Sequence, residues 1–302
     1  MSEAVVIDGA AAAGELRPRV AAEVARLRAA HNVSPGLAAV MVGDDPASQA
    51  YLGAAQRHAK DADIAWMARR LAADIREDEL LTLVRGLNRN RKVNGVIVLR
   101  PLPRHLDPHA VVAALDPDKD VDGAHVTNAG RLITGEAGLA PCTALACLRL
   151  LRAHGAALAG RRALVVGRSA SVGKPVALLL AAADCTVTLA HQQTEGLAEE
   201  CRRADILVAA AGVPGLIRGD WIQPGAVVID VGINRVTGEP GPGGASAGRA
   251  RTVGDVDFTQ AVRFASAITP VPGGIGPMTV ACQFLNTLIA AARQAGAEIQ
   301  DI

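Results

Sequence analysis

A glycine-rich turn at residues 163–175, ALVVGRSASVGKP, holds the residues whose types and spacing most directly suggest chemistry. A β-branched run leads into Gly167, Ser169 and Gly173 follow, and an apolar stretch of helix length begins there. Backbone N–H groups at such a strand-to-helix turn, together with the positive end of the helix, can bind a pyrophosphate. The spacing is not a strict G-x-G-x-x-G, so a plain tight connection stays an alternative to a nucleotide site.

The charges around this turn favour NADP over NAD. NAD-binding folds commonly place Asp or Glu at the end of the next strand, where it bonds the ribose hydroxyls. Here that end is LAHQQT, residues 189–194, with no carboxylate, and Arg168 directly follows the first glycine. A guanidinium without a competing acid suits a 2′-phosphate. The alternative is that Arg168 is an ordinary solvent-exposed loop cation.

A second candidate site lies in DDPASQAYLGAAQRH, residues 44–58, which contains Tyr51, the only tyrosine among 302 residues. The segment Asp-Asp-Pro-Ala-Ser before it can start a helix. Residues four apart share a helix face, so Ala55 is expected beside Tyr51. A single tyrosine is often a half-buried packing residue, and this stays the alternative to a ligand contact.

Strand-like and helix-like segments alternate along the chain, which predicts an α/β fold with buried parallel strands. Predicted strands are 37–42, 95–99, 163–167, 186–190, 205–210 and 226–232, and predicted helices include 75–90, 172–183 and 276–294. The alternation breaks at 122–143, which is rich in glycine and turn residues, so we place the change of domain there. Residues 237–250, rich in Gly, Pro and Ser, predict a mobile surface loop.

Composition argues against several classes of protein. The 31 basic and 30 acidic residues give a net charge of +1, which argues against a dedicated nucleic-acid or polybasic membrane surface. The N-terminal MSEAVVIDGA has no basic segment and is not a secretory signal, and we expect no run near the roughly 20 apolar residues that cross a bilayer. Five scattered cysteines without Cys-x-x-Cys indicate reduced thiols, a cytoplasmic protein and no metal site.

Eight stretches occur along nearly the whole chain: DDPASQAY (44–51), RPLP (100–103), DPDKDVDGAH (116–125), PCT (141–143), GRSASVGKP (167–175), GDWIQPGAVVIDVGIN (219–234), GDVDF (254–258) and TPVPGGIGPMTV (269–280). In this order they resemble the methylenetetrahydrofolate dehydrogenase/cyclohydrolase family. DKDVDG and TPVPGGIGPMT are the most specific of them.

The resemblance implies two α/β domains with a cleft between them. A folate-binding catalytic domain is expected over residues 1–140, with the C-terminal helix 276–302 packing back on it. A Rossmann-type NADP domain with a parallel sheet is expected over residues 141–275. Family members are usually cytoplasmic homodimers that act on a tetrahydrofolate derivative.

The resemblance also assigns roles to single residues. Tyr51 and Asp122 are expected at the catalytic site, with Ser48, Pro272, Gly273 and Gly274 as further substrate-binding residues. The expected cofactor-binding residues are Gly167, Arg168, Ser169, Gly173, Gly232, Ile233 and Asn234.

Two departures from the family concern its hydrolytic step. The motif S-x-x-Y-x-x-x-K places a catalytic lysine where this chain has Ala55, and V-Q-L-P-L-P places a glutamine where it has Leu99. Neither Ala55 nor Leu99 can transfer a proton or form a side-chain hydrogen bond. Hydride transfer, in contrast, mainly needs the folate and nicotinamide rings to be aligned. We therefore expect NADP-dependent oxidation of 5,10-methylenetetrahydrofolate to 5,10-methenyltetrahydrofolate, with weak or absent cyclohydrolase activity.

Three alternatives stay open. His58, Lys60 or water can stand in for the lysine, which would give an ordinary bifunctional enzyme yielding 10-formyltetrahydrofolate. Arg100 replaces an apolar family residue and either points to solvent or brings a cation towards the pterin or the glutamate tail. The alternative from a different class is a non-catalytic folate- or nucleotide-binding protein.

Overall fold

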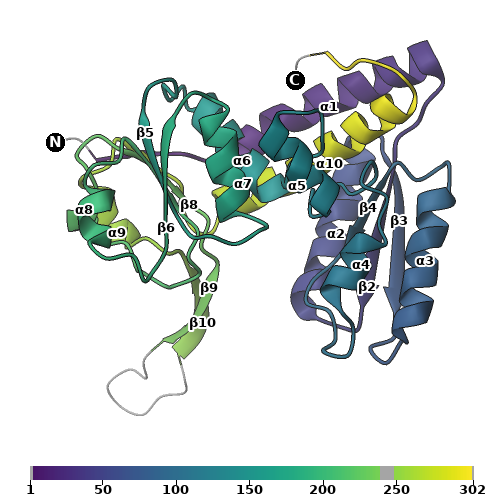
Figure 1. Ribbon diagram of the computed structural model, residues 1–302, viewed down its shortest axis with the longest axis horizontal. Helices are drawn as coiled ribbons and strands as arrows, with labels where there is room; N and C mark the ends of the chain where they lie inside the picture. The colour runs from purple at the N-terminus through teal and green to yellow at the C-terminus, as the bar shows by residue number, and fades with distance from the viewer. Residues whose placement is uncertain (1–2, 239–247, 301–302) are drawn as a thin grey trace. The chain divides into compact units, whose positions relative to one another are not determined.

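The computed structural model describes residues 3–238 and 248–300 of the chain (Figure 1). The chain forms two compact units, the first made of residues 1–12 and 143–279 and the second of residues 13–142 and 280–302. Each unit contains a parallel sheet with helices packed on it, which confirms the predicted α/β class. The expected domain boundaries at 140 and 275 stay predictions.

The first unit is built on a six-stranded parallel sheet in the order β1-β11-β8-β7-β5-β6. Its strands are β1 (Val5–Val6), β5 (Arg162–Val166), β6 (Thr186–Ala190), β7 (Ile206–Ala209), β8 (Val227–Asp230) and β11 (Ala267–Ile268). All four residues of β7 are buried, as expected of a parallel strand covered on both faces. The four strands predicted within 163–232 are confirmed, with ends that differ by at most two residues.

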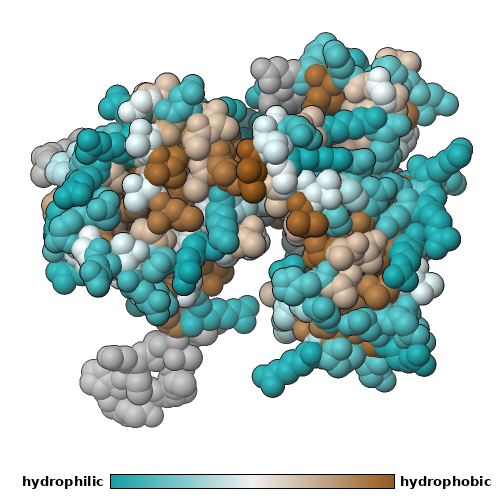
Figure 2. Space-filling model, viewed as in Figure 1, coloured by the Kyte–Doolittle hydropathy of each residue, from teal (hydrophilic) through white to brown (hydrophobic). Residues whose placement is uncertain are grey.

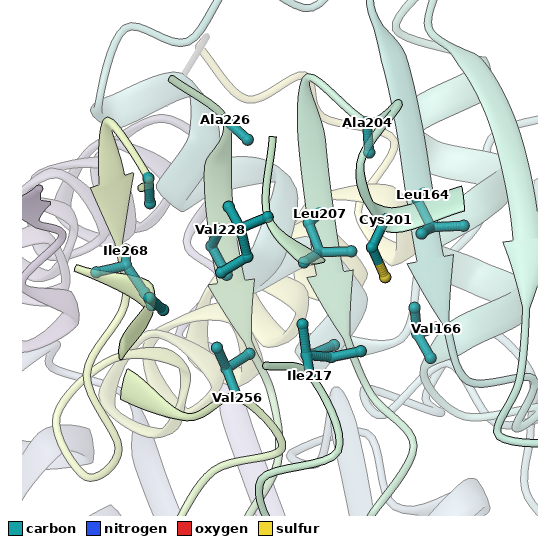
Figure 3. Close-up of a cluster of buried hydrophobic side chains, with 14 of the residues drawn as sticks. Leu164, Val166, Cys201, Ala204, Leu207, Ile217, Ala226, Val228, Val256 and Ile268 are labelled. Atoms are coloured by element: carbon teal, nitrogen blue, oxygen red, sulfur yellow. The ribbon is translucent and has the colours of Figure 1, made fainter. Parts of the chain in front are cut away.

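Helices cover both faces of this sheet (Figure 1). On one face lie α6 (Cys142–Ala153) and α7 (Gly173–Ala181), and on the other lie α8 (Leu197–Cys201) and α9 (Phe258–Ala261). The short 3-10 helix η1 (Gly219–Trp221) contacts α8 and α9. Figure 3 shows part of the core on the second face, where Leu164, Leu207 and Val228 of the strands meet Cys201 and Ile217. The layers leave the carboxyl ends of the strands as the usual place for a ligand.

An antiparallel pair of strands, β9 (Asn234–Gly238) and β10 (Gly248–Val253), follows β8 in the first unit. The sequence did not predict these strands. Thr252 pairs with Arg235, and Val253 pairs with Asn234. The predicted mobile loop at 237–250 falls mostly on residues 239–247, outside the described residues, so its mobility stays a prediction.

The second unit holds a three-stranded parallel sheet in the order β3-β2-β4. Its strands are β2 (Gly36–Val42), β3 (Ala65–Leu71) and β4 (Gly95–Val98), which confirms the strands predicted at 37–42 and 95–99. One face packs on α3 (Glu77–Arg89) and α4 (Pro108–Ala113), where Val40, Leu80 and Val96 are fully buried. On the other face lie α2 (Pro46–Asp61) and α10 (Ile275–Gln294), and α1 (Gly9–His31) runs beside α10 (Figure 1).

Helix α10 corrects one expectation from the sequence. By length and composition it is apolar enough to cross a membrane, although no run of that kind was expected. Inside the protein 72% of its apolar window is buried, and the core helices of soluble proteins have the same composition. Phe284, Leu285 and Leu288 are each at most 2% exposed, so α10 is a core helix of this fold.

A short helix, α5 (Val126–Thr134), lies inside the glycine-rich stretch 122–143. Its start is capped by the His125 ring, which accepts a hydrogen bond from the backbone N of Thr127 at 3.1 Å. Its end is Gly135, which takes the left-handed conformation that often terminates helices. These two local caps explain why a helix forms where the sequence suggested only turns.

Hydrophilic side chains are spread over the visible face of both units rather than gathered in one area (Figure 2). Within the described residues, no three His, Cys, Asp or Glu side chains are placed to hold a metal ion. All five cysteines are buried.

Candidate active site

The glycine turn after β5 lies at the carboxyl edge of the parallel sheet of the first unit. Gly167 has a φ of 136°, a conformation that only glycine adopts readily. A Cβ atom on Gly173 would lie 1.8 Å from the carbonyl oxygen of Gly167, so the two ends of the turn meet backbone to backbone. Helix α7 therefore begins as close to the strand as a pyrophosphate cradle requires.

Replacing Gly173 by alanine is expected to open this turn. The new methyl group would overlap rigid backbone, so the start of α7 must move, at a cost of about 1–3 kcal/mol. We expect the affinity for NADP, measured by calorimetry, to fall about tenfold, with a lower melting temperature. Gly14→Ala is the matched control because an added Cβ there meets nothing within 4 Å. Unchanged NADP affinity in the Gly173 variant would show that the turn is not the cradle.

A pocket lies beside this turn. It is lined by Gly167, Arg168, Ser169, His191, Gln192, Gln193, Ala210 and Ala211. The Ser169 hydroxyl oxygen accepts hydrogen bonds from the backbone N of Val172 at 3.2 Å and of Gly173 at 3.4 Å, which fixes the turn. Arg168 is exposed, and no lining residue carries a carboxylate. Three of the predicted cofactor residues thus line one pocket whose only permanent charge is positive.

A buried aspartate that the sequence analysis did not single out organises the neighbouring loops. Asp255 is 0% exposed, and its Oδ2 accepts hydrogen bonds from the backbone N of Ala211 at 2.6 Å and of Gly212 at 2.8 Å. Its Oδ1 accepts from the side-chain Nδ2 of Asn234 at 2.8 Å. One carboxylate therefore joins the loop after β7 to the predicted cofactor residue Asn234. The sequence feature that could have pointed to Asp255 is its place in the motif GDVDF.

Asp230, at the end of β8, is a second such carboxylate and is 4% exposed. It accepts hydrogen bonds from the backbone N of Gly232, Asp255 and Val256, each at 2.9 Å. Desolvation raises the pKa of Asp230 to about 6, while these N–H groups act in the opposite direction. Asp230 thereby holds the predicted cofactor residue Gly232, as Asp255 holds Asn234, and Ile233 between them is 70% exposed.

In the second unit, Asp45 and Pro46 start α2 as the sequence predicted. The Asp45 carboxylate accepts hydrogen bonds from the backbone N of Ser48 at 2.8 Å and from its hydroxyl at 2.9 Å. That hydroxyl also lies 3.3 Å from the carbonyl oxygen of Arg100. Ser48 is 5% exposed and ties the helix start to the segment after β4, while its predicted substrate contact stays a prediction.

Three side chains from separate elements form a hydrogen-bonded chain in this unit. The Tyr51 hydroxyl of α2 donates to Oε1 of Gln283 on α10 at 2.5 Å. Nε2 of Gln283 donates to Oδ1 of Asp122 at 2.9 Å. The predicted residues Tyr51 and Asp122 are therefore joined through a glutamine that the sequence analysis missed. The sequence feature that could have pointed to Gln283 is an amide within a mainly apolar helical segment.

Burial and neighbouring charges shift the pKa values of Asp122 and Tyr51, the two titratable residues of this hydrogen-bonded series. Desolvation raises the pKa of Asp122 to about 6, and Asp120 adds to that rise, whereas the Gln283 bond and the charge of Arg100 lower the pKa. Desolvation, with the nearby Asp122, raises the pKa of Tyr51 well above its usual value. At neutral pH the pair is therefore mainly a neutral phenol and a carboxylate.

Ala55 and Leu99, at the positions where the resemblance implies a lysine and a glutamine, carry no polar side-chain atom. Ala55 is 0% exposed on α2, and Leu99 is 8% exposed after β4. The His58 ring packs edge-on against Phe284, with ring centroids 6.3 Å apart. Among the described residues, no group bonds to its buried Nδ1. Lys60, the other replacement considered, is exposed.

The predicted substrate residues Pro272, Gly273 and Gly274 lie in the turn before α10, in the first unit. Gly273 has a φ of 109°, and Gly274 is buried. Tyr51 and Asp122 belong to the second unit, so the common role of these five residues at one substrate stays a prediction.

Comparison with known proteins covers both units. The catalytic-domain model of the tetrahydrofolate dehydrogenase/cyclohydrolase family matches residues 7–122, and the NAD(P)-binding-domain model matches residues 141–295. The bifunctional protein FolD of Phenylobacterium zucineum is 56% identical over 295 residues, which cover 98% of this chain and 99% of that protein.

Solved structures agree over the same length. The methylenetetrahydrofolate dehydrogenase-cyclohydrolase of Trypanosoma brucei, in complex with NADP and an inhibitor, has a TM-score of 0.90 and 39% identity, covering 98% of this chain and 100% of that one. The 5,10-methylenetetrahydrofolate dehydrogenase of the silkworm Bombyx mori has a TM-score of 0.89 and 38% identity. The match covers 97% of this chain and 99% of that one. With a catalytic and an NAD(P)-binding domain in the family's order, this chain belongs to the tetrahydrofolate dehydrogenase/cyclohydrolase family.

Proposed function

We propose that this protein oxidises 5,10-methylenetetrahydrofolate to 5,10-methenyltetrahydrofolate with NADP. The observation that carries the proposal is that one chain of this family has both a nucleotide turn at Gly167–Gly173 and a polar site at Tyr51 and Asp122. The close backbone approach at this turn, which leaves no room for a Cβ atom at Gly173, supports a dinucleotide as its ligand.

The proposed roles of the residues follow from their chemistry. When bound, NADP supplies the nicotinamide that takes a hydride from the methylene carbon of the substrate. Asp122, as a carboxylate, accepts hydrogen bonds from the N–H groups of the pterin. Tyr51 lies against the pterin and restricts its position. This oxidation requires no protein group to carry a proton, so Ala55 and Leu99 are compatible with it.

We further propose that NADP is preferred over NAD. Arg168 lines the same pocket as His191, Gln192 and Gln193, none of which carries a carboxylate that would compete for the guanidinium. An exposed cation in that place is available for the 2′-phosphate. The Trypanosoma brucei relative was crystallised with NADP, which also supports this preference.

Arg168→Ala is expected to weaken NADP binding by about 1.5–3 kcal/mol, the loss of one charge-assisted phosphate contact. That corresponds to roughly 10- to 150-fold in Kd, whereas Kd for NAD should hardly change. Arg162→Ala, at the opposite end of β5, is the matched control for removal of an exposed arginine. Equal losses for NADP and NAD would show that Arg168 does not contact the 2′-phosphate.

A second candidate function adds the hydrolytic step. The relatives' names, such as the bifunctional protein FolD at 56% identity, favour an ordinary dehydrogenase/cyclohydrolase over weak or absent hydrolysis. Against this stand Ala55 and Leu99, because neither can carry a proton. His58 is a poor substitute for the family's lysine, because its charged neighbours are Arg17, Asp61 and Arg57. Asp122, which marks the proposed folate site, is not among the charges that shift the His58 pKa.

One experiment separates these candidates. Purified protein is mixed with methylenetetrahydrofolate and NADP, and NADPH and the methenyl species are followed separately. Methenyltetrahydrofolate that accumulates with NADPH indicates dehydrogenase activity with weak hydrolysis. NADPH without accumulation indicates the bifunctional enzyme. Absence of NADPH, together with measurable binding of both ligands, would indicate the non-catalytic alternative.

A homodimer and a cytoplasmic location remain part of the proposal, with light scattering as the test of the dimer.

A further inference from the structure

Gln283 links the two principal residues of the folate site, although no motif draws attention to it. It is 5% exposed on α10, between Cys282 at 0% and Phe284 at 2%. Burying an amide in such surroundings is unfavourable unless both of its ends are hydrogen-bonded. Its two ends bond to Tyr51 and Asp122, so the position is polar because these partners are there.

The chemistry of the three groups fixes the direction of each hydrogen bond. An ionised carboxylate only accepts, so the amide nitrogen of Gln283 must face Asp122. The amide oxygen then faces Tyr51 and also only accepts, so the phenol must donate its proton to Gln283. The lone pairs of the Tyr51 oxygen remain available to accept from a ligand. The bond from Gln283 uses Oδ1 of Asp122, so Oδ2 is likewise available as an acceptor.

We propose that Gln283 is a positioning residue that sets the donor and acceptor pattern of the folate site. It directs the Tyr51 proton towards α10 and holds the Asp122 carboxylate. Asp122 then accepts from the N–H edge of a pterin, while Tyr51, lying against that pterin, presents no hydroxyl proton to it. The inference rests on the proposed function for its substrate class and adds the residue that orients that substrate. Gln283 thus adds an amide to the site formed by Tyr51 and Asp122.

Electrostatics support this role. The charged and titratable groups that act with Asp122 are Asp120 on its own loop, Arg100 after β4, Tyr51 on α2 and Cys142 at the start of α6. The Gln283 bond opposes the desolvation that raises the Asp122 pKa. Without that bond the carboxyl group would stay protonated to higher pH, and a protonated acid presents a donor to the pterin in place of an acceptor.

Two substitutions test the proposal. Gln283→Met keeps the length of the side chain and removes both hydrogen bonds. Gln283→Glu, when protonated, can still donate to Asp122 and accept from Tyr51, and when ionised it repels Asp122. Gln294→Met is the matched control on the same helix, because Gln294 is also hydrogen-bonded, to Asn94 at 2.9 and 3.0 Å.

Three readouts are used: KM and kcat for methylenetetrahydrofolate, Kd for tetrahydrofolate, and the NMR signal of isotope-labelled tyrosine. Tyr51 is the only tyrosine of the chain, so its ring signal reports on this site alone. In the unmodified protein that signal should titrate with the Asp122 pKa of about 6.

Gln283→Met is expected to raise KM and Kd roughly tenfold, with little change in kcat, and to move the Tyr51 titration to higher pH. Gln283→Glu should bind tetrahydrofolate almost normally while the pair of acids holds one proton, and should lose affinity as the pH rises and that proton leaves. A residue that merely filled space would not give this pH-dependent rescue. Gln294→Met should lower stability and leave KM and the titration unchanged.

The inference is overturned if Gln283→Met leaves KM, Kd and the Tyr51 titration as in the unmodified protein, or if Gln294→Met shifts them equally. Loss of affinity in Gln283→Glu at every pH would also overturn it. If the unmodified protein forms no NADPH, the proposed function fails, while Kd for tetrahydrofolate and the Tyr51 titration still decide the role of Gln283.

Discussion

Replacing Ala55 by lysine and Leu99 by glutamine together is expected to raise the rate of methenyltetrahydrofolate hydrolysis by about 10²–10⁴-fold. This is the usual contribution of a positioned acid–base group, and the present side chains cannot supply it. Ala55 follows Tyr51 by one helical turn, so an ammonium group at this position would lie beside the phenol. The measurement is the decay of methenyltetrahydrofolate with enzyme, compared with its decay in buffer alone.

The single substitutions separate the two effects. Ala55→Lys alone is expected to gain little activity and to lose stability, because position 55 is 0% exposed and an unpaired buried ammonium is unfavourable. Leu99→Gln alone adds an amide without a charge and should leave hydrolysis slow. The melting temperature of each variant distinguishes a misfolded protein from a folded one that lacks the chemistry.

The unmodified protein can contradict this expectation. If it clears methenyltetrahydrofolate faster than buffer, it acts as the names of its relatives suggest. If His58→Ala or Lys60→Ala then removes that activity, a base at another position exists. In that case Ala55 and Leu99 would not limit hydrolysis, and the double substitution would give no gain.

Most of the sheet framework was predictable because parallel strands leave a simple pattern. Strand β2, GLAAVMV, is buried at every residue, and its continuous apolar run matched the prediction at 37–42. Helix α5 was missed because its stability comes from local caps at His125 and Gly135 rather than from a long apolar period. The apolar length of α10 was underestimated because Gln283 and Asn286 interrupt it, and their bonds to Asp122 and Val121 make burial possible.

The candidate site was predictable only where its residues lie in local motifs. Gly167, Ser169 and Gly173 follow one strand, and the structure brings them together by a single turn. Gln283 lies 232 residues from Tyr51, so no local pattern could connect them. Likewise, Asp255 bonds to Ala211 and Gly212 across more than forty residues of sequence. Contacts of this kind depend on the order of strands and helices in space, which spacing along the chain does not reveal.

Asp255→Ala is expected to cost roughly 3–5 kcal/mol of folding stability and to give a large loss of NADP affinity. The aspartate is 0% exposed, and its removal leaves the backbone N of Ala211 and Gly212 and the Asn234 amide without their acceptor. Each buried donor left unpaired costs about 1–3 kcal/mol, and neighbouring losses do not simply add. Chemical unfolding and NADP calorimetry on the same samples measure both effects.

Exchanging Asp255 and Asn234 for each other tests whether the predicted losses come from the hydrogen bond between their side chains. Asp255→Asn alone keeps an acceptor for Ala211 and Gly212 but turns an amide group towards the amide of Asn234. Combining it with Asn234→Asp restores a donor facing an acceptor, so the double variant should recover much of the stability lost in the single one. Asp257→Ala is the control, because this residue caps α9 and should cost only about 1 kcal/mol without affecting NADP. A loss in Asp257→Ala as large as in Asp255→Ala would mean that Asp255 has no special part in holding the cofactor loops.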